Sequence, residues 1–421
     1  MATTIQKPIS AMTWASIMSL ALIVNLPGLA VSPMLDNLKI IFPHVSNLEI
    51  QLLTMLPNVL IIPFVLLSGK LSMSSHRINI VAAGLLIFAC STVAYMFAST
   101  MTQLIVISCA MGAGAGLIIP FSTGLLSDSY KEPALMRQLG IQSGISNLVL
   151  VLATFIAGWL ATMKNWHMPF LVYALGIIPV ILIPWLKGVP HPSHSPRDLT
   201  VAAKTETKDV FIDKVCYRSN GFSISRSVTL FALYFTVTAL TIVISYYSSF
   251  LFEQRHWDAS ITGTVTAIFF LFIFLPGFIL PWILKIFRNS TSFFSALSIA
   301  IGLALIVFIP IKLIAVIGAA LCGIGYGIFQ PLFYDKATRI VNNRAKNTLA
   351  MSVIMSSNYI GIVCSPLIID FTRSLITGDH SETFPFIMNF IIALGLLIAT
   401  VIFRHRFCFY IPPSYYNNSL N

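Results

Sequence analysis

Charged side chains are scarce in this 421-residue chain. Lys, Arg, Asp and Glu make up 9% of the residues, whereas hydrophobic residues make up 57%. A soluble domain carries about 25% charged residues, and a much smaller share cannot cover a surface that faces water. The shortage of charge therefore excludes an ordinary soluble protein and predicts a chain that folds in lipid.

Cysteine is also rare, and the six cysteines form no C-x-x-C pair. They predict neither a disulfide framework nor a metal site. The sequence "GAGAG" lies within an apolar run and has no lysine after it, unlike a phosphate-binding loop. We therefore expect no cofactor, no metal and no use of ATP.

Long apolar runs, in contrast, fill the chain. A bilayer core about 30 Å thick needs roughly 20 apolar residues per helical crossing, and these runs are continuous rather than alternating like barrel strands. The first run is too long for the core of a signal peptide. The sequence predicts an all-α membrane protein with twelve transmembrane helices, at Met12–Leu35, Leu48–Leu71, Ile78–Ala98, Gln103–Ser127, Leu139–Met163, Met168–Leu186, Val228–Phe252, Ile261–Leu284, Phe293–Ile311, Leu313–Tyr334, Leu349–Phe371 and Phe384–Arg404.

Twelve crossings place both termini on one side of the membrane, and basic residues indicate which side. Of the 25 Lys and Arg residues, 20 fall on the side of the termini. Basic loops stay in the cytoplasm, so both termini are predicted to be cytoplasmic. We expect a multi-pass protein of a cell membrane, the inner membrane of a bacterium. The net charge of +11 reflects this topology and contact with anionic lipid headgroups, so nucleic acid is not an expected partner.

One extended hydrophilic stretch, Lys187 to Arg226, divides the crossings six and six. The sequence thus predicts an N-terminal six-helix bundle (residues 1–186), a cytoplasmic linker (187–226) and a C-terminal six-helix bundle (227–421).

The two halves repeat each other. "GAGAGLIIP" (Gly112–Pro120) matches "GIGYGIFQP" (Gly323–Pro331) at an offset of 211 residues, and a Ser-Asn pair ending at Asn147 recurs at Asn358 with the same offset. Matches in the same order at constant spacing predict two pseudo-symmetric bundles.

The repeated glycines and proline lie on one helix face, because they are spaced by four residues. Small residues at this spacing let a neighbouring helix approach closely. A proline also removes the hydrogen bond to the carbonyl four residues earlier, which belongs to glycine in both copies. Tight packing and a bendable hinge therefore both remain open for Gly112, Gly116, Pro120, Gly323, Gly327 and Pro331.

Two six-helix halves joined by a cytoplasmic loop resemble the major facilitator superfamily of transporters. "GKLSMSSHRI" (Gly69–Ile78) is similar to the loop that this family has between helices two and three, and Gly69 and Arg77 fit its pattern. "SPMLDNLKIIFP" (Ser32–Pro43) resembles the outer end of helix one in drug-exporter branches. The resemblance implies a secondary transporter whose halves rock against each other.

Neutral polar residues are the expected solute ligands, because two-half transporters place their site between the halves near the midplane. The same residues could instead link helices to one another. The candidates for solute binding are Asn25, Gln142, Asn147, Tyr234, Tyr246, Gln330 and Asn358.

Ionisable residues at membrane depth are functional candidates by default, but here they fall at the predicted helix ends. Asp36 is the candidate for proton coupling, with an exposed helix cap as the alternative. Ion pairs that break as an inner gate opens are a second possibility, with a solvated face as the alternative. The coupling and gating candidates are Asp36, Gly69, Arg77, Asp128, Arg137, Asp335 and Arg339.

These observations predict a secondary active transporter that moves a small amphipathic metabolite or drug-like solute by alternating access, in the direction of export. Its expected partners are the solute and the lipid bilayer, with protons as the candidate coupling ion, and we expect a monomer. An uptake permease for a nutrient or siderophore and a solute-binding membrane sensor are the alternatives. An enzyme is not expected, because no nucleophile–base or metal constellation is present.

Overall fold

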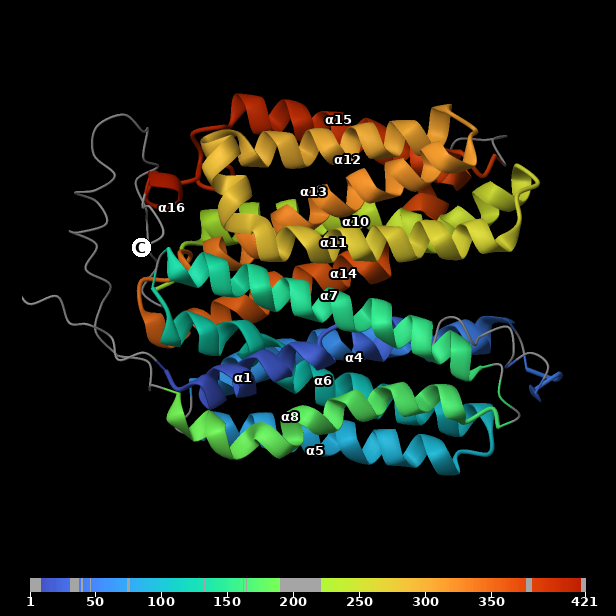
Figure 1. Cartoon of the computed structure of the whole chain (residues 1–421), viewed down its shortest axis with the longest axis horizontal. Helices are drawn as coiled ribbons and strands as arrows, with labels where there is room; N and C mark the ends of the chain where they lie inside the picture. Colours follow the sequence, from blue (N-terminus) through green and yellow to red (C-terminus); the bar gives the residue numbers. More distant parts are fainter. Residues whose placement is uncertain are drawn as a thin grey trace, which may run out of the picture.

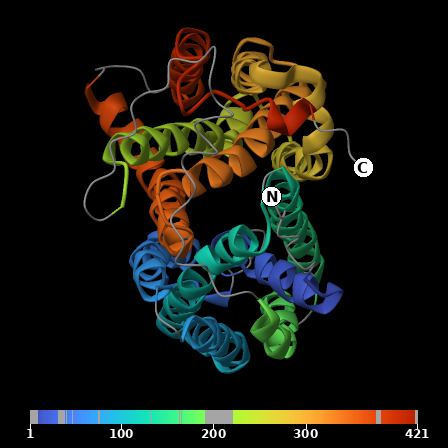
Figure 2. The same ribbon diagram turned by 90° about the vertical axis from the view of Figure 1, so that its left-hand side faces the viewer.

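The computed structural model describes residues 9–30, 38, 41–45, 47–73, 76–131, 133–161, 163, 165–189, 221–375 and 381–417. Across these residues the structure is helical, and the one β-type pairing is an isolated bridge between Phe222 and Val341. The helices form two groups that lie side by side (Figures 1 and 2).

The N-terminal group supplies six crossings. Its elements are α1 (Ala11–Ser19), η1 (Leu20–Ile23), α2 (Leu26–Leu29), α4 (Asn47–Leu71), α5 (Arg77–Ala94), η3 (Tyr95–Phe97), α6 (Met101–Ser129), α7 (Ala134–Leu160), η4 (Met168–Gly176), α8 (Ile177–Leu182) and η5 (Ile183–Gly188). The last three elements together form the sixth crossing. This crossing contains three prolines, Pro169, Pro179 and Pro184, each of which lacks a backbone donor.

The C-terminal group supplies the other six. Its elements are α10 (Ile224–Gln254), α11 (Ala259–Phe287), η6 (Arg288–Ser290), α12 (Thr291–Phe308), α13 (Lys312–Thr338), η7 (Arg344–Lys346), α14 (Asn347–Leu375), α15 (Phe384–Ile402) and α16 (Ser414–Asn417). Eleven apolar segments of the described residues are long enough to cross a membrane, and the longest, Ile261–Phe308, contains both α11 and α12. The chain turns back between these two helices at η6 (Figure 1), so the predicted number of twelve crossings is confirmed.

Among the helix starts, two lie well before the positions predicted from the sequence. Helix α7 begins at Ala134 rather than Leu139, because Arg137 and Gln138 extend the helix beyond its apolar stretch. Helix α10 begins at Ile224, inside the stretch expected to be linker. Residues 190–220 of that stretch lie outside the described residues.

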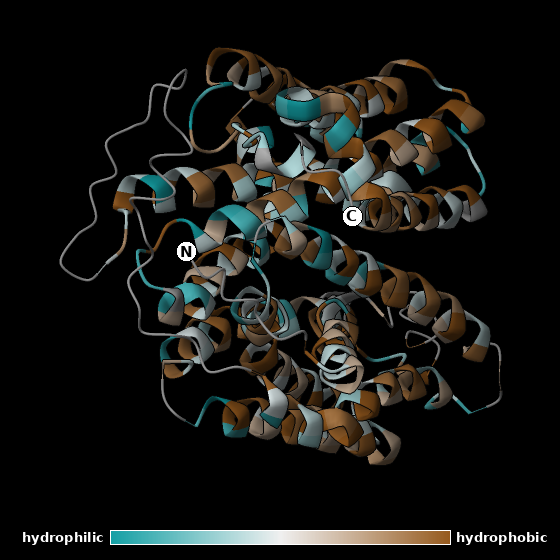
Figure 3. Cartoon of the chain, turned by 60° about the vertical axis from the view of Figure 1, so that its left-hand side comes forward, coloured by the Kyte–Doolittle hydropathy of each residue, from teal (hydrophilic) through white to brown (hydrophobic). Residues whose placement is uncertain are grey.

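The outer surface of the two groups is strongly apolar (Figure 3). Phe155 of α7 is 77% exposed, and Trp282 of α11 is 68% exposed. Monomeric soluble proteins rarely expose large contiguous apolar surfaces. Side chains of this kind face lipid, which agrees with a helical membrane protein.

The repeated glycines pack equivalent pairs of helices. A methyl group on Gly116 of α6 would lie 2.9 Å from the carbonyl oxygen of Ile61 in α4. A methyl group on Gly327 of α13 would lie 2.5 Å from the carbonyl oxygen of Ile273 in α11. Such contacts are shorter than a side chain allows, so backbone lies against backbone in both halves.

The middle glycine of each repeat, Gly114 or Gly325, lies on the opposite face of its helix. A methyl group on Gly114 would meet the carbonyl of Gly84 in α5, and one on Gly325 would meet the carbonyl of Ser295 in α12. Each glycine-rich helix is therefore held between two neighbours. This arrangement explains why the glycines alternate.

The two groups meet at the end of the molecule that carries α16 and the start of α10, which the basic residues predict to be cytoplasmic. A methyl group on Gly69 of α4 would overlap Ser352 of α14, and Gly140 of α7 lies directly against Gly277 of α11. Towards the other end, α7 and α11 diverge (Figure 1). The halves are therefore in contact at the end predicted to be cytoplasmic, and α7 and α11 lie further apart at the other end.

Candidate solute-binding site between the halves

The first crossing is interrupted where it reaches the interface. The ring of Pro27 blocks a hydrogen bond to Ile23 and crowds its carbonyl, so the helix stops before Asn25 and restarts after it. The break leaves the Val24 carbonyl available, and the Tyr359 hydroxyl of α14 donates to it at 3.0 Å. A bond thus joins the first crossing to the other half.

An amide bridge makes a second connection between the halves. Asn147 of α7 donates from Nδ2 to Gln330 Oε1 of α13 at 3.2 Å, and Ser143 Oγ donates to the same oxygen at 2.6 Å. Asn25 Nδ2 donates to Asn147 Oδ1 at 3.4 Å. Three of the predicted solute ligands, Asn25, Asn147 and Gln330, therefore form one network.

The network continues through phenol groups of the C-terminal half. Gln330 Nε2 donates to Tyr334 Oη at 3.1 Å, and the hydroxyls of Tyr334 and Tyr234 share a hydrogen bond of 3.2 Å. In a neighbouring group, Asn358 Oδ1 accepts from Thr238 Oγ1 at 2.8 Å and from Tyr326 Oη at 2.9 Å. Two more predicted residues, Tyr234 and Asn358, are thus placed on this side of the interface.

The remaining two predicted ligands lie apart from the bridge. Gln142 is 1% exposed and donates from Nε2 to Ser122 Oγ at 3.2 Å, so it links α7 to α6 inside the N-terminal half. Tyr246 is partly buried in α10 and makes no hydrogen bond to the network within the described part of the chain.

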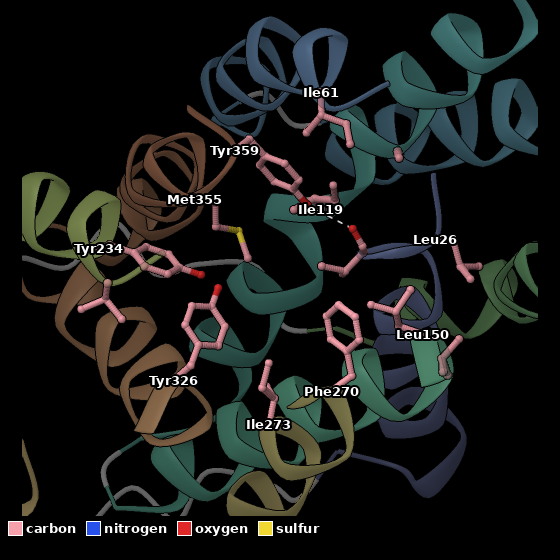
Figure 4. Close-up of a cluster of buried hydrophobic side chains, with 14 of the residues drawn as sticks. Leu26, Ile61, Ile119, Leu150, Tyr234, Phe270, Ile273, Tyr326, Met355 and Tyr359 are labelled. Atoms are coloured by element: carbon pink, nitrogen blue, oxygen red, sulfur yellow. Dashed lines mark hydrogen bonds between the residues drawn. The ribbon is translucent and has the colours of Figure 1, made fainter. Parts of the chain in front are cut away.

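Apolar and aromatic side chains from both halves converge beside the network (Figure 4). Each is at most 8% exposed. The N-terminal half contributes aliphatic groups, whereas the C-terminal half contributes mainly aromatic rings and a thioether. The labelled residues are Leu26, Ile61, Ile119 and Leu150 from the first half and Tyr234, Phe270, Ile273, Tyr326, Met355 and Tyr359 from the second. None of them is charged.

The sequence prediction missed three of these tyrosines. Tyr326, Gln330 and Tyr334 are spaced by four residues and therefore share one face of α13. That spacing could have identified Tyr326 and Tyr334. Tyr359 could not be found in this way, because its partner is a backbone carbonyl exposed by a break in a distant helix.

The gating candidates form two separate ion pairs near the cytoplasmic ends. Arg77 Nη1 lies 2.6 Å from Asp128 Oδ2, and both side chains are buried. Arg339 Nε lies 3.3 Å from Asp335 Oδ2, one helical turn away in α13. Each pair stays within its own half.

The other gating candidates are placed differently. Gly69 lies at the contact between the halves. Arg137 is exposed on the first turn of α7, and neither ion pair includes it in the described region. Asp36 lies outside the described residues.

Comparison with known proteins shows to which family the chain belongs. The sequence profile of the major facilitator superfamily matches residues 11–366. The chain is 24% identical to the quinolone resistance protein NorA of Staphylococcus aureus (strain MRSA252) over 325 residues, which are 75% of this chain and 78% of NorA. It is 28% identical to the multidrug transporter protein MdtP of Bacillus subtilis (strain 168) over 130 residues, which are 31% of this chain and only 24% of MdtP.

Solved structures share the fold over nearly the whole chain. The proton:xylose symporter XylE superposes with a TM-score of 0.70 at 13% identity, over 93% of this chain and 95% of that one. The human organic anion transporter MFSD10 superposes with a TM-score of 0.65 at 14% identity, over 92% of this chain and 97% of that one. Sequence profile, relatives and architecture agree, and the chain belongs to the major facilitator superfamily of membrane transporters.

Proposed function

We propose that this transporter exports a small amphipathic, drug-like solute across the cytoplasmic membrane of a bacterium by alternating access. The observation that carries the proposal is the uncharged wall between the halves. Ile119 and Leu150 on one side face Phe270 and Met355 on the other (Figure 4). Sites for drug-sized ligands are lined mainly by apolar and aromatic side chains, with a few polar groups that fix orientation.

The few polar groups are supplied by the amide and phenol network. Asn25 is partly exposed at the break in the first crossing, and Tyr326 lies in the wall beside Asn358. A solute with one polar edge would find donors and acceptors there while its apolar body contacts the wall. A sugar, in contrast, would leave many hydroxyls without partners against aliphatic side chains.

The direction of transport is supported by the relatives. NorA is named for quinolone resistance and MdtP for multidrug transport. XylE, whose structure is also similar, is a proton:xylose symporter, so the fold alone is compatible with uptake. The apolar wall and the two relatives together favour export.

Alternating access would be driven by an ion gradient, with protons as the proposed coupling ion. Asp36 remains the proposed coupling residue. If it carries the proton, Asp36→Asn abolishes transport driven by a pH gradient while solute binding persists. Transport that stays fully pH-driven in this variant removes Asp36 from the mechanism.

An efflux experiment tests the proposal. Cells that express the chain are loaded with lipophilic fluorescent dyes or a quinolone, and the rate of loss is compared with that of cells lacking the chain. Met355→Trp places a larger side chain at a contact between the halves, where Met355 lies against Thr123, and should slow export at least tenfold. Phe155→Trp adds the same ring on the lipid-facing side, where Phe155 is 77% exposed, and should leave the rate unchanged.

Each result has a clear meaning. Faster loss that depends on Met355 supports export. Faster accumulation of the compound inside the cells would identify an uptake permease instead. Binding of the compound to purified protein without movement across reconstituted vesicles would identify a sensor.

A further inference from the structure

The segment that follows α15, residues 403–417, lies against the cytoplasmic end of the C-terminal half and ends in α16 (Figures 1 and 2). Four of its side chains, Cys408, Phe409, Ile411 and Tyr415, are at least 91% buried. This burial shows that the segment is packed against the protein and not only connected to it.

A buried lysine anchors the segment to α13. Lys336 is 5% exposed, and its Nζ donates to the carbonyl oxygens of Phe407 at 2.6 Å and Tyr410 at 2.8 Å. Its ammonium also lies 5.3 Å from the centre of the Phe407 ring. A buried ammonium is costly unless its donors are paired, so Lys336 and the segment require each other.

The corner between α11 and α12 supplies two further anchors. Asn289 Oδ1 accepts from the backbone nitrogen of Ile411 at 2.9 Å, and Ser292 Oγ donates to the carbonyl of Phe409 at 3.2 Å. Together with Lys336, these bonds fix residues 407–411 to the C-terminal half.

Tyr415 connects the segment to a gating candidate. Its hydroxyl donates to Asp335 Oδ1 at 2.8 Å and accepts from Arg339. The segment therefore supplies a hydroxyl that hydrogen-bonds to both members of the Asp335–Arg339 ion pair.

The segment also shares a buried apolar cluster with the other half of the protein. Ile411 and Tyr415 belong to one buried apolar cluster with Leu280 of α11 and with Met136, on the first turn of α7. Met136 is 2% exposed. The cluster joins both halves at the cytoplasmic contact, where opening to the inside would have to separate α7 from α11.

We propose that residues 403–417 are a cytoplasmic latch that stabilises the outward-facing arrangement. The segment stays fixed to the C-terminal half through Lys336 and the α11–α12 corner. When α7 moves away, Met136 leaves the cluster, and apolar surface of the cluster that Ile411 and Tyr415 help to form becomes exposed to water. Exposing buried apolar surface is unfavourable, so the latch opposes inward opening. The proposal rests on the alternating-access part of the proposed function and holds for either direction of transport.

Two matched isoleucines test the latch in the full-length protein. Ile411→Ala removes methyl groups from the cluster, where Ile411 is 1% exposed, whereas Ile402→Ala makes the same change at a side chain that is 67% exposed. Hydrogen–deuterium exchange is measured in lipid nanodiscs for peptides that cover the start of α7 and the end of α11. Ile411→Ala should increase exchange at both peptides by about tenfold. The smaller side chain loses part of the apolar burial that opposes inward opening. Ile402→Ala should match the unmodified protein.

Tyr415→Phe provides a second variant that keeps the buried ring and removes only the hydroxyl. It should increase exchange in the same two peptides by a smaller factor. If Ile411→Ala fails to fold, Tyr415→Phe tests the latch by itself. The latch is refuted if the segment itself exchanges faster in these variants while the start of α7 is unchanged. This experiment involves no solute, so its outcome is separate from that of the efflux test.

Discussion

The hydroxyl of Tyr359 in α14 donates to the backbone carbonyl of Val24, 3.0 Å away, and so joins the broken first crossing to the opposite half. Pro27 removes the hydrogen bond to Ile23 and interrupts the helix, and the Val24 carbonyl lies within this interruption. This bond forms in the outward-facing arrangement, in which the two halves meet beside the network.

Tyr359→Phe tests how much this bond contributes. The ring remains, but the Val24 carbonyl loses its partner, which costs about 1–3 kcal/mol for a buried group. The equilibrium should therefore shift towards the inward-facing arrangement by about fivefold or more. Distances between spin labels at exposed positions 137 and 285 report this shift. Tyr246→Phe, at a partly buried tyrosine outside the network, is the control, and equal distances in both variants would show that the bond does not affect the equilibrium.

The buried pair of Arg77 and Asp128 should contribute to stability in a way that an exposed pair does not. Their side chains are 5% and 2% exposed, so Asp128→Asn removes the negative charge that Asp128 places beside a buried guanidinium. Such a change costs about 3–5 kcal/mol. Thermal unfolding in detergent should show a marked loss for Asp128→Asn.

Lys312 and Asp258 provide the control for this ion pair. Their side chains are 49% and 77% exposed at a distance of 3.1 Å, and exposed pairs contribute only about 0–1 kcal/mol. Lys312→Met should therefore leave the unfolding temperature almost unchanged. If both variants lose the same stability, burial of the Arg77 pair has no special effect.

The sequence predicts those features of the structure that depend on a pattern within one segment of the chain. Apolar runs identify the twelve crossings because a span needs only length and hydrophobicity. The spacing of Gly116 and Gly327 indicates close packing because it belongs to a single helix face. The bridge between Asn147 and Gln330 joins residues 183 positions apart, and no local pattern specifies which polar side chains meet across the interface.

The C-terminal segment shows the same limit. Residues 403–417 contain too few apolar positions for a span and read as an ordinary tail, although Lys336 binds two of their carbonyls. The anchoring lysine was visible only as a charge near the end of a helix. Its burial follows from tertiary packing, which composition does not reveal.

Alanine at the repeated glycines should disrupt helix packing. A methyl group at Gly327 would lie 2.5 Å from the Ile273 carbonyl oxygen, whereas one at Gly395 would meet nothing within 4 Å. Overpacking of this kind costs about 1–3 kcal/mol. Gly327→Ala should therefore lower the unfolding temperature and Gly395→Ala should not. Equal temperatures would mean that α13 and α11 separate at little cost.

The hinge interpretation makes a different prediction from the packing one. Helices α6 and α13 each contain a proline, Pro120 and Pro331, yet continue through it. Replacing both by alanine restores two backbone hydrogen bonds without adding bulk next to the glycines. If the helices bend there during transport, exchange between the two arrangements should slow severalfold in spin-label measurements. An unchanged exchange rate would leave the glycines and prolines with a packing role alone.

The thiol of Cys408 offers a chemical readout of the C-terminal segment. Burial raises its pKa to about 11, although the nearby charge of Lys336 offsets part of this effect. Because the thiolate is the reactive form, alkylation by a maleimide should be slow at pH 7 and should rise about tenfold per pH unit up to pH 9. The Cys408 peptide of the same protein unfolded in denaturant serves as the reference for each sample. Lys336→Met, which removes the anchor, should release the segment and bring the alkylation rate of Cys408 close to that of this reference. A rate for Cys408 that stays low in this variant would mean that the other anchors hold the segment without the lysine.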